Sequence, residues 1–596
     1  MKCKEHYLTI LLSMPSPPHK GSTVTITVET LADMLFCTTR NVKLIMRKLV
    51  EEGLVAWTAG VGRGNPSQMT ILRELDEVID EYFRELLAKG RMKEAIELMA
   101  HKAMPQATRE RLRVLLDNQF GFQVEETPSS RLDVLRVTRG RKLATLDPAF
   151  VFSATEAYFL EQIFDTLLVF DPTKKRFLPS IAHAWESNTE GSQWTFYLRK
   201  AVRFHHGRVL TAKDVQYSLE RIRTVQSISR WQYEDIERIE VESDTIITFH
   251  LRQPNRFFLH YMSSVTMSIL PHDVVFDERA IIGTGPFRMT ENSEQVLVVE
   301  AFDDYFGHRA LLDRVESWYM PERARDERQY MLPFADDAHA EQTDQDAYFE
   351  YREQGCRYLI FNFKKSGVLH QLKFRQAMRI VYDRLALIRD LKGTRHLPAD
   401  SFLPEKSSQA LFVEQSLEQA RALLAESGYN GETLRLYYYD KRDENSDATW
   451  LQERCAAIGL SLSLHPLCIT TFLDAGTVED ADMMLSGEVL ESDVEWGMLR
   501  LFKDEGTAFF RFLNESQREL IDTHLHDFVH LQAEKERNDV FDRIEQLVRE
   551  ELWVLYGVHM KRTPSYHRSL NGVKLDSFGW IDFSKLWIKP AERMEH

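Results

Sequence analysis

The stretch LADMLFCTTRNVKLIMRKLVEEG, residues 31–53, decides the fold of the N-terminal part of this chain. Its apolar residues recur with a helical period on both sides of Cys37 and Thr38, which predicts one helix over 31–36 and a second that begins after the turn. Thr38 is a preferred N-cap residue for the second helix. One stripe of that helix is apolar and formed by Val42, Ile45 and Leu49. Two helices joined by a tight turn in this way predict a DNA-reading helix-turn-helix.

The opposite side of the predicted second helix carries cations and one leucine. Arg40 and Lys43 lie near its N-terminal end, where side chains reach base edges in a major groove. Arg47 and Lys48 lie further along and suit phosphate contacts, which set the register without reading sequence. The predicted DNA-binding residues are Thr39, Arg40, Lys43, Leu44, Arg47, Lys48, Arg63 and Asn65.

The sequence around this helix pair predicts a winged helix. A helix is expected over residues 5–14 and a strand over 24–28, both before the helix pair. After it, LVAWTAG and QMTIL predict two strands joined by the Gly-rich turn VGRGNPS, with Arg63 at the tip of the wing. No helix opens after these glycines, so they do not form a phosphate-cradling loop. A charged helix in an unrelated three-helix unit is the alternative.

The composition describes a multidomain globular protein with a basic head. A chain of 596 residues exceeds what one core fills, and 43% hydrophobic content needs no disulfide framework. Residues 1–75 carry nine basic and six acidic side chains, a net charge of +3, which leaves −19 on the remainder. Five scattered cysteines without a CxxC pair predict reduced thiols. No signal peptide or membrane span is expected, which predicts a cytoplasmic protein without a membrane partner.

Helical periodicity continues from Arg73 to Phe120 and breaks at Gly90 and Pro105. The polar, turn-rich ETPSS, residues 126–130, marks a joint. We therefore predict three parts: a winged helix-turn-helix domain over 1–75, a helical connector over 76–130 and a further domain over 131–596. In the last part strand-like and helical stretches alternate, among them a helix from Ala212 capped by Thr211, which predicts a mixed α/β body with more than one lobe.

The body resembles the periplasmic solute-binding proteins of peptide and nickel importers over nearly all its length. The resemblance rests on FDTLL, PSIAHAW, the long block WTFYLRKAVRFHHGRVLTAKDVQYSLERI at 194–222, GTGPF and FRQAMRIVYDR, which occur in the order of that family. It implies a bilobal fold that closes on a ligand, with lobe I at about 131–320 plus 546–596 and lobe II at about 322–545. The implied ligand-binding residues are Phe152, Thr155, Trp231, Phe287, Asn362 and Trp496.

A winged helix ahead of such a body resembles the SgrR-type transcriptional regulators. FCTTRNVK, Trp57, the GRG at 62–64 and FGWIDFSKLW at 578–587 carry this closer likeness. The resemblance implies promoter DNA and a small solute as partners, and a homodimer on paired half-sites. The sequence leaves three chemical classes of solute open: sugar-like, phosphorylated and oligopeptide. The aspartate that clamps a peptide amine in the peptide binders has no counterpart in the segment 481–502.

Two other functions are weighed against this one. The first is a solute-binding component of an ABC importer for peptides or oligosaccharides, which requires export and leaves residues 24–73 without a role. The second is a zinc hydrolase around His526 and His530, spaced as in a chelating pair but with Asp527 where a metalloprotease needs glutamate. No nucleophile motif or phosphate-binding loop accompanies them, so we expect no enzyme activity, no cofactor and no metal.

Overall fold

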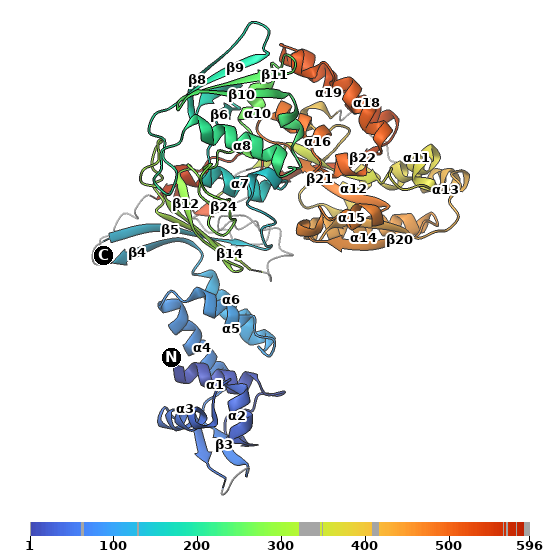
Figure 1. The fold of residues 1–596 in the computed structure, drawn as a ribbon. Coiled ribbons are helices and arrows are strands. Elements are labelled where there is room, and N and C mark those ends of the chain that lie inside the picture. The colour runs from blue at the N-terminus through green and yellow to red at the C-terminus, as the bar shows by residue number, and fades with distance from the viewer. Residues whose placement is uncertain are drawn as a thin grey trace. The chain divides into compact units, whose positions relative to one another are not determined.

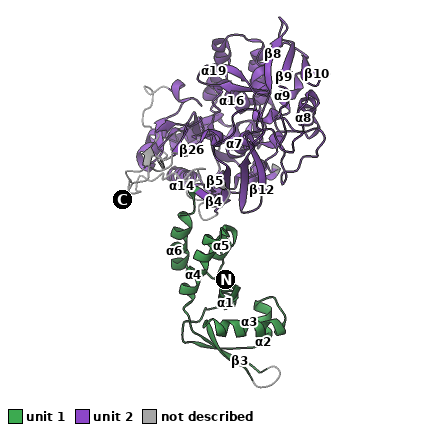
Figure 2. Ribbon diagram, turned by 90° about the vertical axis from the view of Figure 1, so that its left-hand side faces the viewer, with its two compact units in different colours: residues 1–123 green, residues 124–596 purple. Residues whose placement is uncertain are grey.

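The computed structural model describes residues 2–60, 65–127, 130–320, 346–348, 350–407, 416–563, 565–567, 570–579 and 581–588. The chain divides into two compact units, residues 1–123 and 124–596, which Figure 2 shows in different colours. No helix of the described ranges combines the length and the apolar character that a membrane crossing needs.

Unit 1 begins with a winged helix whose elements follow the predicted order (Figure 1). Its three strands form an antiparallel sheet in the order β1-β3-β2. The predicted strand over 24–28 ends earlier, because the Oγ1 of Thr27 accepts a hydrogen bond from the amide of Thr30 (3.1 Å) and caps the next helix. The elements are α1 (Lys2–Leu12), β1 (Thr23–Ile26), α2 (Val28–Met34), α3 (Thr39–Glu51), β2 (Val55–Thr58) and β3 (Ser67–Ile71).

The predicted connector helices pack with the winged helix inside the same unit. They are α4 (Leu75–Ala88), α5 (Met92–Met99) and α6 (Gln106–Asp117). The hydroxyl of Tyr7 in α1 donates to the carbonyl of Arg73 (2.5 Å), and the ammonium of Lys4 binds Glu85 on α4 (2.6 Å). The predicted boundary at residue 75 therefore lies within one compact unit, and the break between the units comes at 123/124, before the predicted joint at 126–130.

The first lobe of unit 2 contains two sheets. A mixed sheet has the order β12-β13-β14-β5-β4, in which β14 returns to pair in parallel with β5. An antiparallel sheet, β10-β11-β9-β8, packs Phe196 and Phe249 against Phe258. The strands are β4 (Gly121–Thr127), β5 (Ser130–Arg139), β8 (Ala182–Ser187), β9 (Gln193–Leu198), β10 (Ile236–Ser243), β11 (Ile246–Leu251), β12 (Phe287–Asn292), β13 (Val296–Ala301) and β14 (Arg314–Tyr319), with the hairpin β6 (Leu168–Asp171) and β7 (Arg176–Pro179).

The helices of this lobe are α7 (Ala154–Ile163), α8 (Ala212–Thr224), α9 (Trp231–Glu234) and α10 (Phe258–Met262). The predicted cap of α8 is confirmed: Thr211 and Asp214 form a reciprocal capping box at its start.

The second lobe is built on a mixed sheet of the order β20-β19-β21-β17-β22. Helix α14 packs on β19 and β20, as Figure 1 shows. The strands are β17 (Gly355–Phe361), β19 (Leu434–Tyr439), β20 (Leu462–Leu467), β21 (Met483–Val489) and β22 (Val554–Tyr556), and three shorter ones are β16 (Tyr351–Arg352), β18 (Arg395–Pro398) and β23 (Val558–Arg562). The helices are α11 (Leu372–Val381), α12 (Arg384–Leu391), α13 (Leu417–Glu426), α14 (Arg442–Ala457), α15 (Ala475–Asp480), α16 (Val494–Lys503), α17 (Ala508–Phe512), α18 (Glu515–Leu525) and α19 (Glu534–Glu550).

Residues 493–537, which the sequence assigned to lobe II, also bind lobe I. The carboxylate of Asp504 accepts a hydrogen bond from the hydroxyl of Ser229 (2.7 Å), and Asp493 binds the Nδ1 of His260 (2.5 Å). The two lobes are therefore joined by buried polar contacts on this side of unit 2.

Candidate functional site

Helix α3 places one apolar face in the core of unit 1 and one polar face in solvent. Thr38 caps it as predicted, since its Oγ1 accepts a hydrogen bond from the amide of Asn41 (3.4 Å). The side chains of the predicted apolar stripe, Val42, Ile45 and Leu49, are all buried. Because a helix held on one side presents the other side rigidly, the exposed face is a preformed surface.

The exposed face of α3 carries the predicted cations. Thr39, Arg40, Lys43, Leu44, Arg47 and Lys48 are all exposed. Leu44 is 56% exposed and lies between cationic neighbours on this face. Arg47 forms an exposed ion pair with Glu51 at 3.0 Å, so it is less available than Arg40 and Lys43. This face has the charge and shape of a major-groove reader.

Of the two residues predicted to contact DNA from the wing, only Asn65 lies within the described residues. Arg63 lies outside the described residues, and Asn65 is exposed two residues before the start of β3. Sequence reasoning missed Phe36, which is 94% exposed in the turn before α3 and has a φ of +48°. A phenylalanine with positive φ is a strained choice for a turn. The sequence placed Phe36 at the end of a helix over 31–36, but α2 ends at Met34, so Phe36 falls in the turn.

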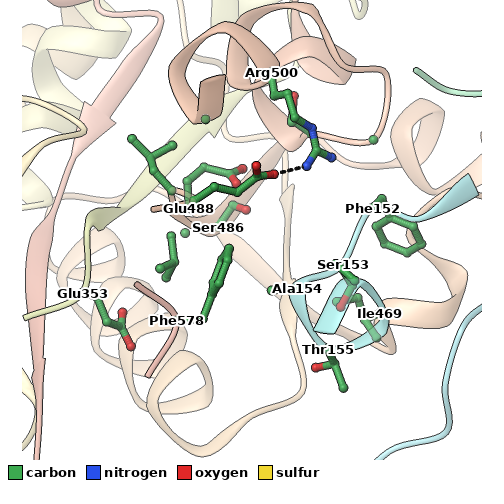
Figure 3. A pocket seen from close by; sticks show the side chains of 18 of the residues that line it. Phe152, Ser153, Ala154, Thr155, Glu353, Ile469, Ser486, Glu488, Arg500 and Phe578 are labelled. Atoms are coloured by element: carbon green, nitrogen blue, oxygen red, sulfur yellow. Dashed lines mark hydrogen bonds and ion pairs between the residues drawn. The ribbon is translucent and has the colours of Figure 1, made fainter. Parts of the chain in front are cut away.

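Unit 2 contains a cavity of about 360 Å³ between its two lobes. Lobe I contributes the end of β5, the loop before α7 and the first turn of α7. Lobe II contributes the ends of β19 and β21, the start of α14 and part of α16. Figure 3 shows Phe152 and Thr155 on one side of this cavity, across from Glu488 and Arg500.

Most charged groups of the cavity wall are neutralised by a neighbour. Each of four guanidinium groups binds a carboxylate within 3.0 Å, and these cation–anion pairs are Arg141–Glu156, Arg357–Glu444, Arg562–Glu353 and Arg500–Glu491. Arg500 also lies 3.3 Å from Asp504. Such groups are buried at an acceptable cost because each has its counter-charge.

Two further carboxyl groups of the wall have raised pKa values. Glu161 is exposed within the cavity, and its surroundings there, with Asp576 and Glu491 nearby, raise the pKa of its carboxyl. Burial raises the pKa of Glu488 to about 7, and Glu488 accepts a hydrogen bond from the hydroxyl of Tyr358 (3.0 Å). Burial also raises the pKa of Glu491. The acids in segment 481–502 are therefore poorly suited to bind a cationic group.

The cavity wall also holds cations that sequence reasoning missed. Lys441 is the N-cap residue of α14, and Arg139 ends β5. Neither makes an ion pair within the described ranges, and burial lowers the pKa of both, that of Arg139 to about 10. A charged residue directly after a buried strand was the available signal, but only the fold shows that the ends of β5 and β19 face one cavity.

Two of the six predicted ligand residues line the cavity, Phe152 and Thr155. Trp496 is buried and packs against Trp231, with ring centroids 5.6 Å apart. Phe287 is fully buried, and the amide of Asn362 donates to the carbonyl of Ala481 (2.8 Å). The structure does not bring these last four residues to the cavity; large aromatic side chains more often fill cores.

The GTGPF motif at 283–287 holds α7 in place rather than contacting a ligand. A Cβ on Gly283 would lie 2.0 Å from the carbonyl oxygen of Ile163, and one on Gly285 would lie 2.5 Å from its carbonyl carbon. The Nδ1 of His205 accepts a hydrogen bond from the Gly283 amide (3.2 Å). Burial lowers the pKa of His205 to about 4. The motif therefore fixes the C-terminal end of the helix whose first turn borders the cavity.

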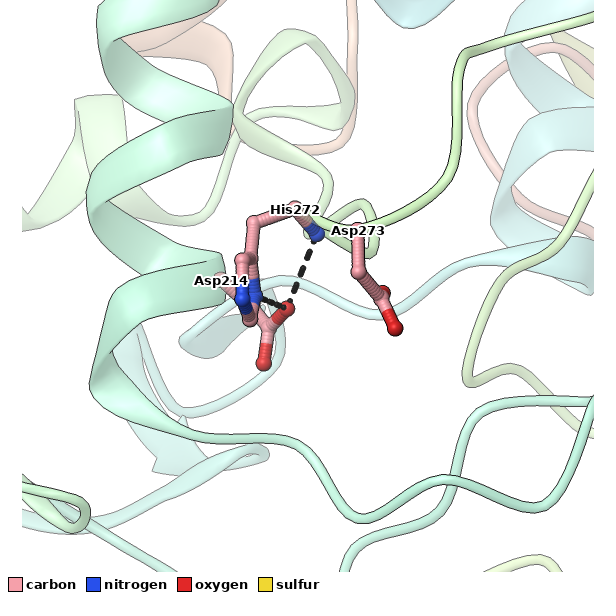
Figure 4. Close-up of side chains that lie close together, drawn as sticks. All are labelled: Asp214, His272 and Asp273. Atoms are coloured by element: carbon pink, nitrogen blue, oxygen red, sulfur yellow. Dashed lines mark hydrogen bonds and ion pairs between the residues drawn. The ribbon is translucent and has the colours of Figure 1, made fainter.

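Among the described residues, Asp214, His272 and Asp273 lie close enough to hold a cation (Figure 4). Arg208 already supplies the positive charge, at 2.5 Å from Asp214 and 2.8 Å from Asp273. Asp214 also accepts hydrogen bonds from the amides of Thr211 and His272. The group is an ion-pair cluster at the start of α8.

The histidine pair of the HDFVH stretch does not share one helix face. His526 is the C-terminal cap of α18, and His530 ends a short 3₁₀ turn. The expected one-turn spacing therefore does not hold, because the α-helix ends between the two histidines.

Comparison with known proteins agrees with this architecture. A family model described as "Sugar transport-related sRNA regulator N-term" matches residues 4–126. A second, described as "Bacterial extracellular solute-binding proteins, family 5 Middle", matches residues 176–509. The first match covers the winged helix with α4, α5 and α6, and the second covers most of both lobes.

Relatives match over the whole chain. The uncharacterized protein YhjP of Bacillus subtilis is 30% identical over 594 residues, which is 99% of this chain and 100% of that protein. The HTH-type transcriptional regulator SgrR of Pectobacterium atrosepticum is 26% identical over 584 residues, 96% and 97% of the two chains. The oligopeptide-binding protein AppA of Bacillus subtilis, solved with a nonapeptide, has a TM-score of 0.65 at 19% identity and covers 77% of this chain and 99% of that one. The predicted fold class is confirmed.

Proposed function

The chain belongs to the SgrR-type transcriptional regulators, which join an SgrR N-terminal domain to a family 5 solute-binding domain, and we propose that its winged helix binds promoter DNA under the control of a small solute held in the cavity of unit 2. The observation that supports this most directly is the exposed cationic face of α3, opposite an apolar face that is buried. A rigid basic helix face is what major-groove recognition requires.

The DNA contacts divide by position on α3. Arg40 and Lys43 lie in the first turns, where a recognition helix meets base edges, and a guanidinium donates two hydrogen bonds to guanine. Lys48 and Arg47 lie further along, where they contact phosphates. We also assign DNA contacts to Thr39, Asn65 and Arg63. We also place two copies of the chain on paired half-sites, as winged-helix proteins commonly bind.

The solute acts through the two lobes of unit 2. A ligand that contacts both lobes stabilises the closed arrangement by its difference in affinity between closed and open forms. If closure alters the DNA-binding unit, DNA and solute affect each other's affinity by the same factor. Both partners are met in the cytoplasm, where we place the chain. The chain carries out no chemical step in this scheme.

Fluorescence anisotropy of the full chain tests the proposal. The chain is titrated onto its own upstream DNA and onto a shuffled duplex of equal length, at several salt concentrations. We expect tighter binding to the upstream DNA, weakening steeply as salt rises because counterions are released from phosphates. An Arg40→Ala variant should lose this preference, whereas Arg113→Ala, an exposed cation on α6, should keep it.

Binding to neither duplex at the lowest salt would contradict the proposal. It would turn the winged helix into a protein-contact module and favour a role of the chain in solute transport.

A further inference from the structure

Phe36 follows helix α2 in a backbone conformation that usually belongs to glycine. The amide of Cys37 donates to the carbonyl of Ala32 (3.0 Å), and the amide of Phe36 donates to the carbonyl of Asp33 (3.3 Å). These two hydrogen bonds form a Schellman motif, in which the residue after the C-cap takes a positive φ. The φ of Phe36 is +48°, which is unfavourable for a residue that has a Cβ atom.

Other helices of unit 1 end in the same motif with glycine at this position. Gly53 follows α3 with a φ of +67°, and Gly90 follows α4 with a φ of +66°. In both cases the next amide donates to the carbonyl five residues back, at 2.9 Å. Unit 1 therefore uses the unstrained residue at these two helix ends and a phenylalanine at the end of α2.

The strain at Phe36 is not offset by packing within the described chain. Leu552 has the same conformation after α19, with a φ of +50°, but its side chain is only 6% exposed and packs in the core. Phe36 is 94% exposed, so its ring adds almost no apolar burial to the fold. The other described non-glycine residues with positive φ are small or polar, and they are Lys175, Ala201, Gln226 and Lys392. A strained backbone that presents an exposed aromatic ring indicates a contact outside the chain.

The surroundings of Phe36 favour DNA as the partner of its ring. Phe36 lies three residues before Thr39, the first residue of α3, and three residues span at most about 11 Å. Residues 35–48 carry four basic side chains and no acidic one. DNA offers both matching chemistries at once, since its phosphates attract the cations and its deoxyribose faces are apolar.

We propose that Phe36 is a DNA-contacting residue whose ring packs against the sugars of the strand that borders the groove read by α3. The inference rests on the proposed function, in which α3 enters the major groove. The Schellman motif holds the ring directly before the start of α3 and so fixes its place relative to Arg40. The contact is apolar and neutralises no phosphate. It therefore positions α3 on DNA without adding to the salt dependence of binding.

Fluorescence anisotropy of the full chain on its upstream DNA, at several salt concentrations, tests the inference. Phe36→Gly and Phe36→Asn remove the ring and suit a positive φ, whereas Phe36→Tyr keeps an aromatic ring. Gln226→Gly is the matched control, because Gln226 is exposed at the same position of the same motif after α8, with a φ of +55°. Hydrogen exchange of the α2 amides, measured by mass spectrometry on the same preparations, reports the local stability of this helix.

We expect Phe36→Gly and Phe36→Asn to raise the Kd for the upstream DNA at least about fivefold, because the apolar contact of the ring is lost. The slope of log Kd against log salt should stay as in wild type, whereas Lys48→Gln, which removes a cation, should lower it by about one. Phe36→Tyr and Gln226→Gly should keep the wild-type Kd. The α2 amides should exchange about threefold more slowly in both variants without the ring, since the strain is relieved.

A wild-type Kd in Phe36→Gly and Phe36→Asn would overturn the inference and would make another protein, rather than DNA, the partner of the ring. A loss of affinity in Phe36→Tyr equal to that in Phe36→Gly would also overturn it. Faster exchange of α2 in the variants without the ring would overturn it too, because the ring would then stabilise the turn itself. None of these outcomes affects the proposed function as long as wild type prefers its upstream DNA to the shuffled duplex. If wild type binds neither duplex, the proposed function fails and the inference fails with it.

Discussion

The charged groups of α3 and those of the cavity differ in what surrounds them. On α3, Arg40 and Lys43 are exposed and have no ionic partner in the described structure. Around the cavity, Arg141, Arg357 and Arg500 are each held by a carboxylate. An exposed cation costs the fold almost nothing and is free for a partner, whereas a buried one must be compensated before the fold is stable.

This contrast distinguishes charged residues that bind a partner from charged residues that stabilise the fold. Removing a charge from α3 should change DNA affinity and leave stability unchanged. Removing one member of a buried pair should cost stability. Lys441 is the exception on the cavity side, since it is half-buried and makes no ion pair among the described residues.

The largest effect is expected for Asp504→Ala. The Asp504 carboxylate is fully buried, lies 3.3 Å from Arg500 and accepts hydrogen bonds from Ser229 and the amide of Gly506. Its removal leaves these donors unsatisfied and should lower the free energy of unfolding by about 3 kcal/mol, measured by chemical denaturation. Ser229→Ala, which removes one of the three donors, should cost about 1 kcal/mol. Equal free energies of unfolding for Asp504→Ala and wild type would contradict the claim that the buried charges around the cavity stabilise the fold.

Arg40→Ala should weaken binding to the cognate duplex by about 1–3 kcal/mol if its guanidinium reads guanine. Binding to random DNA should weaken less, and the Tm of the chain should not change, because Arg40 is exposed. Anisotropy on both duplexes and a melting curve measure these effects. Equal losses on the two duplexes would make Arg40 a phosphate contact.

Glu161→Gln should alter the pH dependence of stability. Glu161 is exposed within the cavity, but the cavity wall and the nearby Asp576 and Glu491 raise its pKa from 4.5 to about 8, so the folded chain retains a proton that the unfolded chain releases between these values. The stability that this proton contributes is fully present below pH 4.5 and is lost as the pH rises through 8. The variant, which cannot ionise, should match wild type near pH 5 and melt at a higher temperature near pH 8.5.

Glu237→Gln on the exposed face of β10 is the control for this pH series. It should follow wild type at every pH. A Glu161→Gln variant that also follows wild type from pH 5 to pH 8.5 would show that the carboxyl is solvated.

The smallest effect is expected for Leu44→Ala. An exposed leucine among cations can pack against a thymine methyl group, which is worth about 0.5–1 kcal/mol. Wild type should lose this amount when thymines of the upstream duplex are replaced by deoxyuridine, and the variant should not distinguish the two duplexes. If wild type also binds both duplexes equally, Leu44 does not contact a thymine methyl group.

Most of unit 1 could be predicted from the sequence, because its signals are local. The stripe of Val42, Ile45 and Leu49, the cap at Thr38 and the exposed face of α3 all follow from a period of 3.6 residues within one helix. Packing of α4 on α1 could not be predicted, since it depends on contacts of Tyr7 and Lys4 with residues 66 and 81 positions away.

The cavity could be predicted only in outline. Phe152 and Thr155, which the resemblance implied as ligand residues, line the cavity, because both lie in one short segment before and within the first turn of α7. Arg139, Lys441 and Glu488 were missed, since they come from three strand ends that only the folded lobes bring together. Trp231 and Trp496 were chosen as aromatic residues, but they stack on each other in the core.

The central claim is that a small solute in the cavity changes the affinity of the winged helix for DNA. Its most direct test is the Kd of the full chain for its upstream DNA, measured by anisotropy with and without a saturating amount of one solute. That solute is the member of a panel of sugars, sugar phosphates and oligopeptides that most raises the Tm of wild type. Ionic strength is held constant with potassium chloride. Our account predicts a change in Kd of at least about fivefold. An identical Kd with and without the solute would contradict the account.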